Sequence, residues 1–210
     1  MAKYCLCTWG VGELLFVKQM LGQVARQLSI VAYIAFALIL MWVASGTAAE
    51  LRGGEQWGTT ALPHEGELAP EFSLADESGT VRHLDDWHGH WVILYFYPKD
   101  FTSGCTIEAR RFQQDLPQYE AINATVVGVS ADSVDSHRKF CDAEGLKFPL
   151  LSDTAGEASA AYGSWMGDIA LRNTFLIDPD GVLRAIDPIV TPSLHSREVL
   201  QQLRQFQQEV

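Results

Sequence analysis

One short stretch constrains the fold more than any other: the continuous apolar run of residues 92–97, Val-Ile-Leu-Tyr-Phe-Tyr, which ends at Pro98. A run of this length without polar residues is typical of a strand that is buried on both faces. Farther along the chain, apolar side chains recur at helical spacing, at Ile107, Ala109, Phe112 and Leu116, as far as Pro117. The pattern therefore predicts a buried strand that passes into an amphipathic helix, with Cys105 at the start of that helix.

The 210 residues are enough for one domain with additional segments. From about residue 69, strand and helix patterns alternate and a hairpin follows, which favours a thioredoxin-like α/β fold with a central mixed sheet flanked by helices. The expected elements are a hairpin at 72–84 that turns near 76–79, a strand at 91–97, a helix to about 119, a strand at 125–130, a helix at 134–144, a strand at 148–152, a short helix at 155–162, a hairpin of 174–177 and 182–186 that turns at 178–181, and a last helix from about 193.

Cys105 is the candidate nucleophile. The first turn of a helix offers unpaired N–H groups and partial positive charge, which favour a thiolate over a thiol. The neighbouring Ser103 and Gly104 are too small to build a core, and Thr102 brings a hydroxyl within three residues of the sulfur. These neighbours indicate an accessible pocket. The alternative is a purely structural cysteine, because free cysteine is among the most buried residue types.

Residues 95–109, Tyr-Phe-Tyr-Pro-Lys-Asp-Phe-Thr-Ser-Gly-Cys-Thr-Ile-Glu-Ala, resemble the active-site segment of the peroxiredoxins. The pattern of that family is Pro, three residues, Thr or Ser, two residues, Cys. The resemblance continues, in order, through residues 126–140, 148–153 and 172–178, covers about 67–205, and is greatest to the bacterioferritin-comigratory, or Q-type, subgroup. It implies a thioredoxin-like fold of the peroxiredoxin type and a thiol-dependent peroxidase that needs no cofactor or metal.

The resemblance also implies roles for individual residues. Cys105 would be the peroxidatic cysteine, Thr102 would align the peroxide with it, and Pro98 would shield the pocket. Arg172 would supply the positive charge beside the sulfur. Glu108 matches a position that is Glu in many relatives, where it would orient an arginine; the alternative is an ordinary carboxylate in the first turns of a helix, which the helix dipole favours.

The resolving cysteine departs from the commonest Q-type pattern, which has a second cysteine five positions after the first. Position 110 is Arg in this chain, and Cys141 follows Cys105 by 36 positions. Some Q-type relatives carry their resolving cysteine on that next helix, so the resemblance implies this role for Cys141. Its alternative is a buried helical residue beside Phe140.

The implied cycle reduces hydrogen peroxide and organic hydroperoxides to water and alcohols. The Cys105 thiolate would become a sulfenic acid, Cys141 would convert it to an intramolecular disulfide, and a thioredoxin-like dithiol would reduce that disulfide. The resemblance also implies a monomer. An intramolecular cysteine pair needs no partner subunit for resolution, although it does not exclude dimers.

The N-terminal part has a different character. No charged residue occurs between Arg26 and Glu50, and residues 28–44 are almost wholly apolar. At ~1.5 Å per residue, 28–49 would span ~33 Å as a helix, about the hydrocarbon thickness of a membrane. The small residues at 47–49 equally fit a signal-peptidase site, above all if translation starts at Met20.

Two interpretations of this segment therefore remain, a cleaved signal sequence and a single transmembrane anchor that would hold the protein on the membrane. Either divides the chain into a leader at 1–49, a linker at 50–66 and the peroxiredoxin domain at 67–210. Lys3, Lys18 and Arg26 precede the apolar stretch, so the positive-inside rule places the domain outside the cytoplasm, in the periplasm or another extracytoplasmic space.

Charge excludes one class of partner. The first 49 residues carry three Lys or Arg against one Glu, a net charge of +2. Since the whole chain has a net charge of −11, the remaining residues carry −13. Nucleic acids are bound largely through Lys and Arg contacts to phosphate, and we expect no such partner. An isolated Cys5-Leu-Cys7 and the histidines of residues 83–90 lack the usual spacing of metal ligands, so no metal is expected either.

Two other functions fit the same fold. A thiol–disulfide oxidoreductase would carry C-x-x-C at the helix start, but Thr102 stands at the position three before Cys105. A non-catalytic exported binding module would use a Cys105–Cys141 disulfide only as a staple. A very negative, reductant-resistant disulfide potential would indicate the staple.

Overall fold

The structure is a computed structural model that describes residues 63–208. The predicted leader at 1–49, its hydrophobic helix and most of the predicted linker at 50–66 lie outside the described residues. Within residues 63–208, no helix has the length and apolar content needed to cross a membrane. The last predicted linker residue already belongs to the fold, because the N–H of Gly66 donates to the carbonyl of Leu183 over 2.8 Å.

The described residues follow the predicted order of strands and helices. The elements are β1 (Ser73–Asp76), β2 (Val81–His83), the 3-10 helix η1 (Leu84–Trp87), β3 (Trp91–Phe96), α2 (Ser103–Glu120), β4 (Ala124–Ser130), α3 (Val134–Glu144), β5 (Leu150–Ser152), α4 (Glu157–Ala161), β6 (Thr174–Ile177), β7 (Leu183–Asp187) and α5 (His195–Gln208). The helix predicted at 134–144 has the predicted bounds, whereas η1 is an element that the sequence pattern did not predict.

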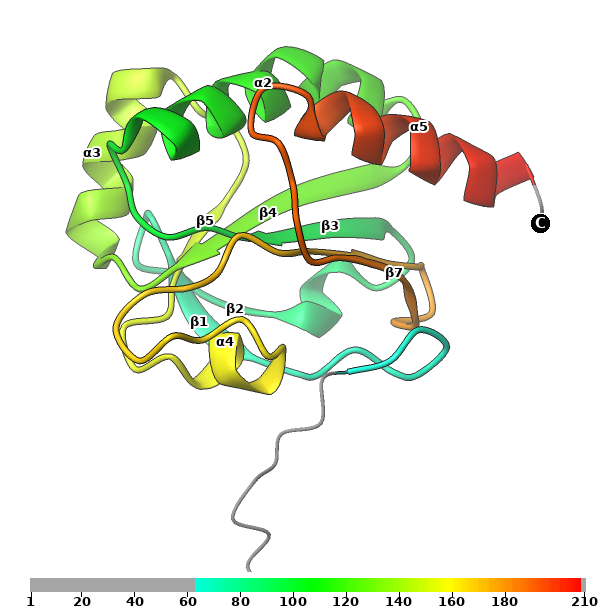
Figure 1. Cartoon of the computed structure of the whole chain (residues 1–210), viewed down its shortest axis with the longest axis horizontal. Coiled ribbons are helices and arrows are strands. Elements are labelled where there is room, and N and C mark those ends of the chain that lie inside the picture. Colours follow the sequence, from blue (N-terminus) through cyan, green and yellow to red (C-terminus); the bar gives the residue numbers. More distant parts are fainter. Residues whose placement is uncertain (1–62, 209–210) are drawn as a thin grey trace, which may run out of the picture. The chain divides into compact units, whose positions relative to one another are not determined.

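The strands of the described part form one sheet in the order β2-β1-β5-β4-β3-β6-β7. β3 pairs in parallel with β4 and antiparallel with β6, and β4 pairs in parallel with β5. The predicted central mixed sheet is confirmed, and so is the thioredoxin-like fold (Figure 1).

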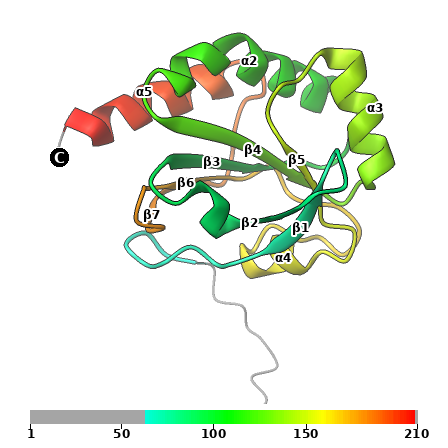
Figure 2. The ribbon, with the colours of Figure 1, turned by 180° about the vertical axis from the view of Figure 1, so that it is seen from behind.

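β3 lies at the centre of two hydrophobic cores. All six of its residues are buried, and they alternate between the faces of the sheet. Ile93 and Tyr95 pack with residues of α2, α3 and α5, whereas Leu94 and Phe96 pack on the opposite face with residues of α4. Figures 1 and 2 show α2 and α5 together on one side of the sheet and α4 on the other.

α2 presents a buried face that differs in one position from the predicted stripe. Ile107 is 44% exposed, so its place in that stripe was wrong. The neighbouring Glu108 is buried in place of Ile107. A pattern of apolar residues cannot reveal a buried carboxylate. The helix also continues through Pro117 to Glu120, one residue beyond the expected end.

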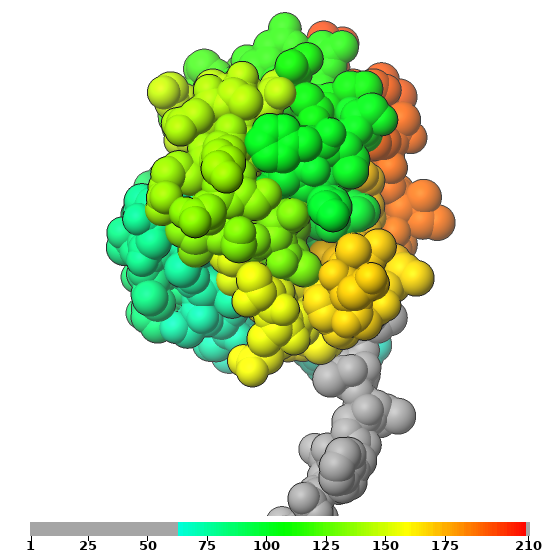
Figure 3. Space-filling view, turned by 90° about the vertical axis from the view of Figure 1, so that its left-hand side faces the viewer, coloured from blue at the N-terminus to red at the C-terminus, as the bar shows by residue number. Residues whose placement is uncertain are grey.

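The antiparallel pairing of β3 with β6 assembles the region around Cys105. The N–H of Phe96 donates to the carbonyl of Asn173 over 2.8 Å, so the residues before β6 lie beside the end of β3. α2 begins a few residues beyond that end, and Arg172 therefore lies against its first turn. Figure 3 faces this side of the molecule, where the green surface of α2 borders the gold segment that follows α4.

Candidate active site

Cys105 is the third residue of α2, as predicted, and is only 2% exposed. Its backbone N–H is among the first four of the helix, which have no partner within the helix. The guanidinium nitrogen Nη2 of Arg172 lies 3.1 Å from its Sγ. Both features stabilise negative charge on the sulfur, so the site is built for a thiolate.

Arg172 is itself held by a carboxylate. Its Nη1 donates to Oε2 of Glu108, whose side chain is fully buried. Burial alone would lower the pKa of Arg172, but the nearby Glu108 and Cys105 raise it above its usual value. The guanidinium therefore stays charged. The contact with Arg172 supports the orienting role of Glu108 over that of an ordinary carboxylate in the first turns of the helix.

Thr102 and Pro98 lie on the loop between β3 and α2. Thr102 is the N-cap residue of α2 and is exposed, and its Oγ1 donates to the carbonyl of Lys99 over 3.0 Å. A hydroxyl has one donor and two lone pairs, so this bond leaves the oxygen free to accept a hydrogen bond from a ligand. Pro98 is half-buried directly after β3, where it fixes the backbone as the chain leaves the sheet.

Cys141 lies on α3, and it and Cys105 are free thiols in the structure. Burial, with smaller contributions from Glu77 and Asp100, raises the pKa of Cys141 to about 12. A thiol at this position is protonated at neutral pH. It reacts slowly until it is exposed.

Side chains of α3 contact α2 and the loop that precedes it. Arg110, at the position where the commonest Q-type pattern has its second cysteine, forms an ion pair with Glu144 at the end of α3. The ring of Phe101 lies edge-on to that of Phe140, with 5.1 Å between their centroids. The helix that carries Cys141 therefore lies next to α2, which carries Cys105, and next to the loop before α2.

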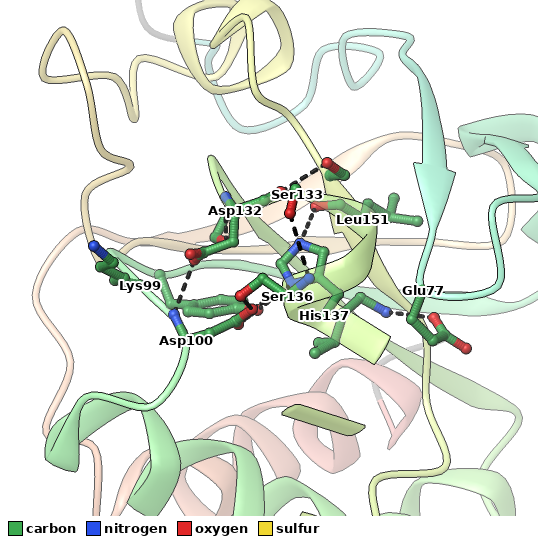
Figure 4. Close-up of polar contacts among 12 residues, drawn as sticks. Glu77, Lys99, Asp100, Asp132, Ser133, Ser136, His137 and Leu151 are labelled. Atoms are coloured by element: carbon green, nitrogen blue, oxygen red, sulfur yellow. Dashed lines mark hydrogen bonds and ion pairs between the residues drawn. The ribbon is translucent and has the colours of Figure 1, made fainter. Parts of the chain in front are cut away.

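A buried ion pair also joins that loop to α3 (Figure 4). Nδ1 of His137 lies 3.0 Å from Oδ2 of Asp100, and Nε2 lies 3.2 Å from the carbonyl oxygen of Leu151. The hydroxyl oxygen of Tyr97 also lies 3.3 Å from Nδ1, so both ring nitrogens have polar partners. His137 lies one helical turn before Cys141 on the same face of α3.

The Asp100 carboxylate has hydrogen-bond contacts with three side chains. Tyr97 Oη donates to Oδ1 over 2.8 Å, while Ser136 Oγ and His137 Nδ1 share Oδ2. Burial would raise the pKa of Asp100, but the bonds from His137, Ser136 and Tyr97 outweigh it and lower the pKa below its usual value. The carboxylate therefore stays charged at neutral pH.

The structure thus brings together the predicted residues Cys105, Arg172 and Glu108. The sequence analysis gave no role to Asp100, His137 or His195, although the first two fall within the matched blocks. His195 carried no signal beyond its place near the start of the last helix, yet its Nδ1 lies 2.7 Å from Oε1 of Glu108.

No group of three or more His, Cys, Asp or Glu side chains within residues 63–208 is placed to hold a metal ion. A surface hollow of about 200 Å³ is lined by Trp87, Val92 and Pro179 among others. It lies at the beginning of β3, at the far end of that strand from Cys105. This hollow therefore does not belong to the thiol site.

Comparisons with known proteins identify the family. The model of the AhpC/TSA family matches residues 66–186. The chain belongs to this family. The putative peroxiredoxin bcp of Coxiella burnetii is 40% identical over 146 residues, which are 66% of this chain and 97% of that protein. The peroxiredoxin Bcp of Bacillus subtilis is 35% identical over 154 residues, 69% of this chain and 97% of that protein.

Solved structures give the same assignment. A mutant of Xylella fastidiosa PrxQ superposes with a TM-score of 0.65 at 36% identity, and the match covers 68% of this chain and 96% of that one. Peroxidoxin BcpB of Mycobacterium tuberculosis has a TM-score of 0.62 at 32% identity, with 67% and 96% covered. The AhpC/TSA chain described here is therefore a Bcp/PrxQ-type peroxiredoxin, a thiol peroxidase, as its resemblance implied.

Proposed function

We propose that this peroxiredoxin reduces hydroperoxides through a Cys105 sulfenic acid, which Cys141 resolves as an intramolecular disulfide. The observation that carries the proposal is the 3.1 Å contact between Nη2 of Arg172 and Sγ of Cys105 at the start of α2. A guanidinium held at a thiolate by a buried carboxylate favours attack on an uncharged peroxide, whose O–O bond breaks as negative charge moves to the leaving oxygen.

In the first step the Cys105 thiolate attacks one oxygen of ROOH, the O–O bond breaks, and the departing alkoxide takes a proton and leaves as ROH. The products are the Cys105 sulfenic acid and the alcohol, or water from hydrogen peroxide. Thr102 Oγ1 can accept a hydrogen bond from the peroxide while Arg172 donates to its oxygens. Both groups are most effective as charge shifts in the transition state.

In the second step the Cys141 thiol attacks the sulfenic sulfur, and a disulfide and water are formed. The Cα atoms of the two cysteines must come within ~7 Å, but each sulfur is buried within a helix. The helices therefore have to open locally before the disulfide forms. Because the His137–Asp100 ion pair anchors α3, it opposes this opening.

A dithiol reductant would complete the cycle by disulfide exchange. One related protein is the mitochondrial thioredoxin-dependent peroxide reductase of Drosophila melanogaster, 38% identical over 152 residues. That relation and the exposed loop at Thr102 favour a thioredoxin-type reductant. Peroxide-dependent oxidation of NADPH with thioredoxin and its reductase, followed at 340 nm, tests this choice, and turnover with glutathione but not thioredoxin would contradict it.

Stopped-flow fluorescence and mass spectrometry test the chemistry. The reduced chain from residue 50 onward is mixed with hydrogen peroxide, as the parent and as C105S and C141S. We expect rapid, stoichiometric formation of a Cys105–Cys141 disulfide in the parent, a trapped sulfenic acid in C141S and no fast phase in C105S. Sustained thiol-driven turnover by C141S would show that another thiol resolves the intermediate.

A disulfide that forms but resists thioredoxin, with slow peroxide reaction in the parent, would instead support the stapled binding module. Fast disulfide exchange without fast peroxide reduction would support a thiol–disulfide oxidoreductase.

We further propose that the domain works outside the cytoplasm as a monomer. The apolar stretch at 28–44 and the cations before it support this location, and an intramolecular cysteine pair needs no second subunit. Expression of the full chain in a Gram-negative host, followed by fractionation and N-terminal mass spectrometry, tests the location. Cleavage after Ala49 indicates a signal sequence, an intact membrane-bound chain indicates an anchor, and an intact cytoplasmic chain contradicts both.

A further inference from the structure

The Glu108 carboxylate has a second partner, which lies on the last helix. His195 is the first residue of α5 and only 1% exposed. Its Nδ1 lies 2.7 Å from Oε1 of Glu108, and its Nε2 lies 2.9 Å from Oγ1 of Thr174 on β6. Because the Glu108 carboxylate can only accept, Nδ1 carries a proton and donates.

A count of charges shows why this second partner matters. Arg172 faces two anions, the Glu108 carboxylate and the Cys105 thiolate, through different nitrogens. All of these groups are largely buried, and an unbalanced charge is costly in such a site. One guanidinium cannot neutralise two anions. A cation on the other carboxylate oxygen would leave the charge of Arg172 available to the sulfur.

The surroundings of His195 favour a cation. Carboxylates approach it from two other elements: Glu108 on α2 through the 2.7 Å contact, and Asp187 on β7 through an electrostatic interaction. Glu198 on its own helix is exposed. Asp115 on α2 binds the hydroxyl of the next residue, Ser196, over 2.9 Å. Arg172 binds the other oxygen of the Glu108 carboxylate, and Arg197 on α5 is exposed. The hydroxyl of Thr174 can accept a bond from Nε2–H, so both protons of an imidazolium have partners.

We propose that His195 is a positioning residue of the peroxidatic site: as an imidazolium it neutralises Glu108, so that Arg172 stabilises the Cys105 thiolate. The chain of contacts runs from Thr174 through His195, Glu108 and Arg172 to the sulfur. His195 does not touch the reacting atoms and acts through the carboxylate. The inference rests on the proposed function, because it assigns its effect to the thiolate that attacks the peroxide.

The test measures the reactivity of Cys105 in the full chain as a function of pH. Iodoacetamide alkylation of the reduced protein, quantified on the Cys105 peptide by mass spectrometry, gives the pH midpoint of the reactive thiolate without interference from other cysteines. H195Q retains an N–H donor but cannot carry a charge. We expect its midpoint to rise by roughly one pH unit, with a roughly tenfold lower rate toward hydrogen peroxide below the midpoint.

H88Q is the matched control, because His88 is the exposed C-cap residue of η1. The pH midpoint of Cys105 in H88Q should equal that of the parent. The decisive comparison is a cycle with E108Q. If His195 acts through Glu108, the shift caused by H195Q should vanish in the E108Q background. Circular dichroism and thermal unfolding show whether each variant is folded. If H195Q does not fold, H195N replaces it in the same measurements.

The outcomes separate the two proposals. A parent protein in which Cys105 reacts fast with peroxide, together with an unchanged midpoint in H195Q, overturns the role of His195 alone. An equal shift in H195Q with and without Glu108 also overturns it, since the effect would then bypass the carboxylate. A parent protein with no fast peroxide reaction at Cys105 overturns the proposed function itself.

Discussion

The ion pair between His137 and Asp100 leads to a prediction about stability. Their side chains are 0% and 1% exposed, so H137L leaves a buried carboxylate without its histidine partner. Removal of one partner from a buried ion pair costs about 3–5 kcal/mol. Leucine has a similar volume, so we ascribe the loss to charge and hydrogen bonding. We expect the free energy of unfolding to fall by about 3–5 kcal/mol, a large part of the ~5–15 kcal/mol of a typical domain.

Urea unfolding followed by tryptophan fluorescence measures this loss. With a slope of about 2 kcal/mol per molar urea, the midpoint should fall by about 2 M. H88L is the control at an exposed histidine and should change the free energy by less than about 0.5 kcal/mol. D100N should also destabilise, and the double variant D100N/H137L should lose less than the sum of the two single losses, because both disrupt one interaction.

The pH dependence gives a second measure. The lowered pKa of Asp100 means that its contribution to stability is present above about pH 4 and is lost as the pH falls through the native value. In H137L the effect of burial on Asp100 is no longer opposed by the interactions with His137, so Asp100 takes up a proton in the native state at higher pH. The deficit of H137L should therefore shrink between pH 6 and pH 4. A loss below about 1 kcal/mol at pH 7 would refute the contribution of the His137–Asp100 contact to stability.

Three further predictions concern other parts of the site and core. R172K should lower the rate constant of Cys105 with hydrogen peroxide about 100-fold in stopped flow, since one ammonium cannot replace two directed nitrogens; an unchanged rate would contradict the role of the guanidinium. Cys141 should be alkylated at pH 8 about 1,000-fold more slowly in the native reduced protein than in urea, because its pKa is raised to about 12; equal rates would disprove its burial. G128A should cost about 1–3 kcal/mol in urea unfolding, because a Cβ would lie 2.8 Å from the hydroxyl of Tyr95; unchanged stability would show that the core yields there.

The sequence predicted the strands and helices well because their signals are local. The buried run at 91–96 and the helical spacing after it need no knowledge of the rest of the chain. η1 at 84–87 was missed because four residues are too few to show a period. The exposure of Ile107 was missed because the buried turn of α2 uses a carboxylate in its place.

The site was predicted only in part for a related reason. Cys105, Thr102 and Pro98 form one continuous motif, whereas the partners of buried polar groups come from distant segments. His195 is 87 positions from Glu108, and His137 is 37 positions from Asp100. A buried histidine and an exposed one look the same in a single sequence, so these pairings became visible only in the folded chain.

The long separation between the parts of the site also orders the events of its synthesis. Arg172 follows Cys105 by 67 positions, and His195 follows it by 90. At ~5–20 residues per second, a ribosome needs roughly 5–18 s to make the chain between Cys105 and His195. For roughly the first 3–13 s of this interval Arg172 has not been made, so the new thiol has no guanidinium beside it. With the role proposed for His195, Cys105 would become a strong nucleophile only when the last helix docks, and peroxide would spare it while the chain is unfinished.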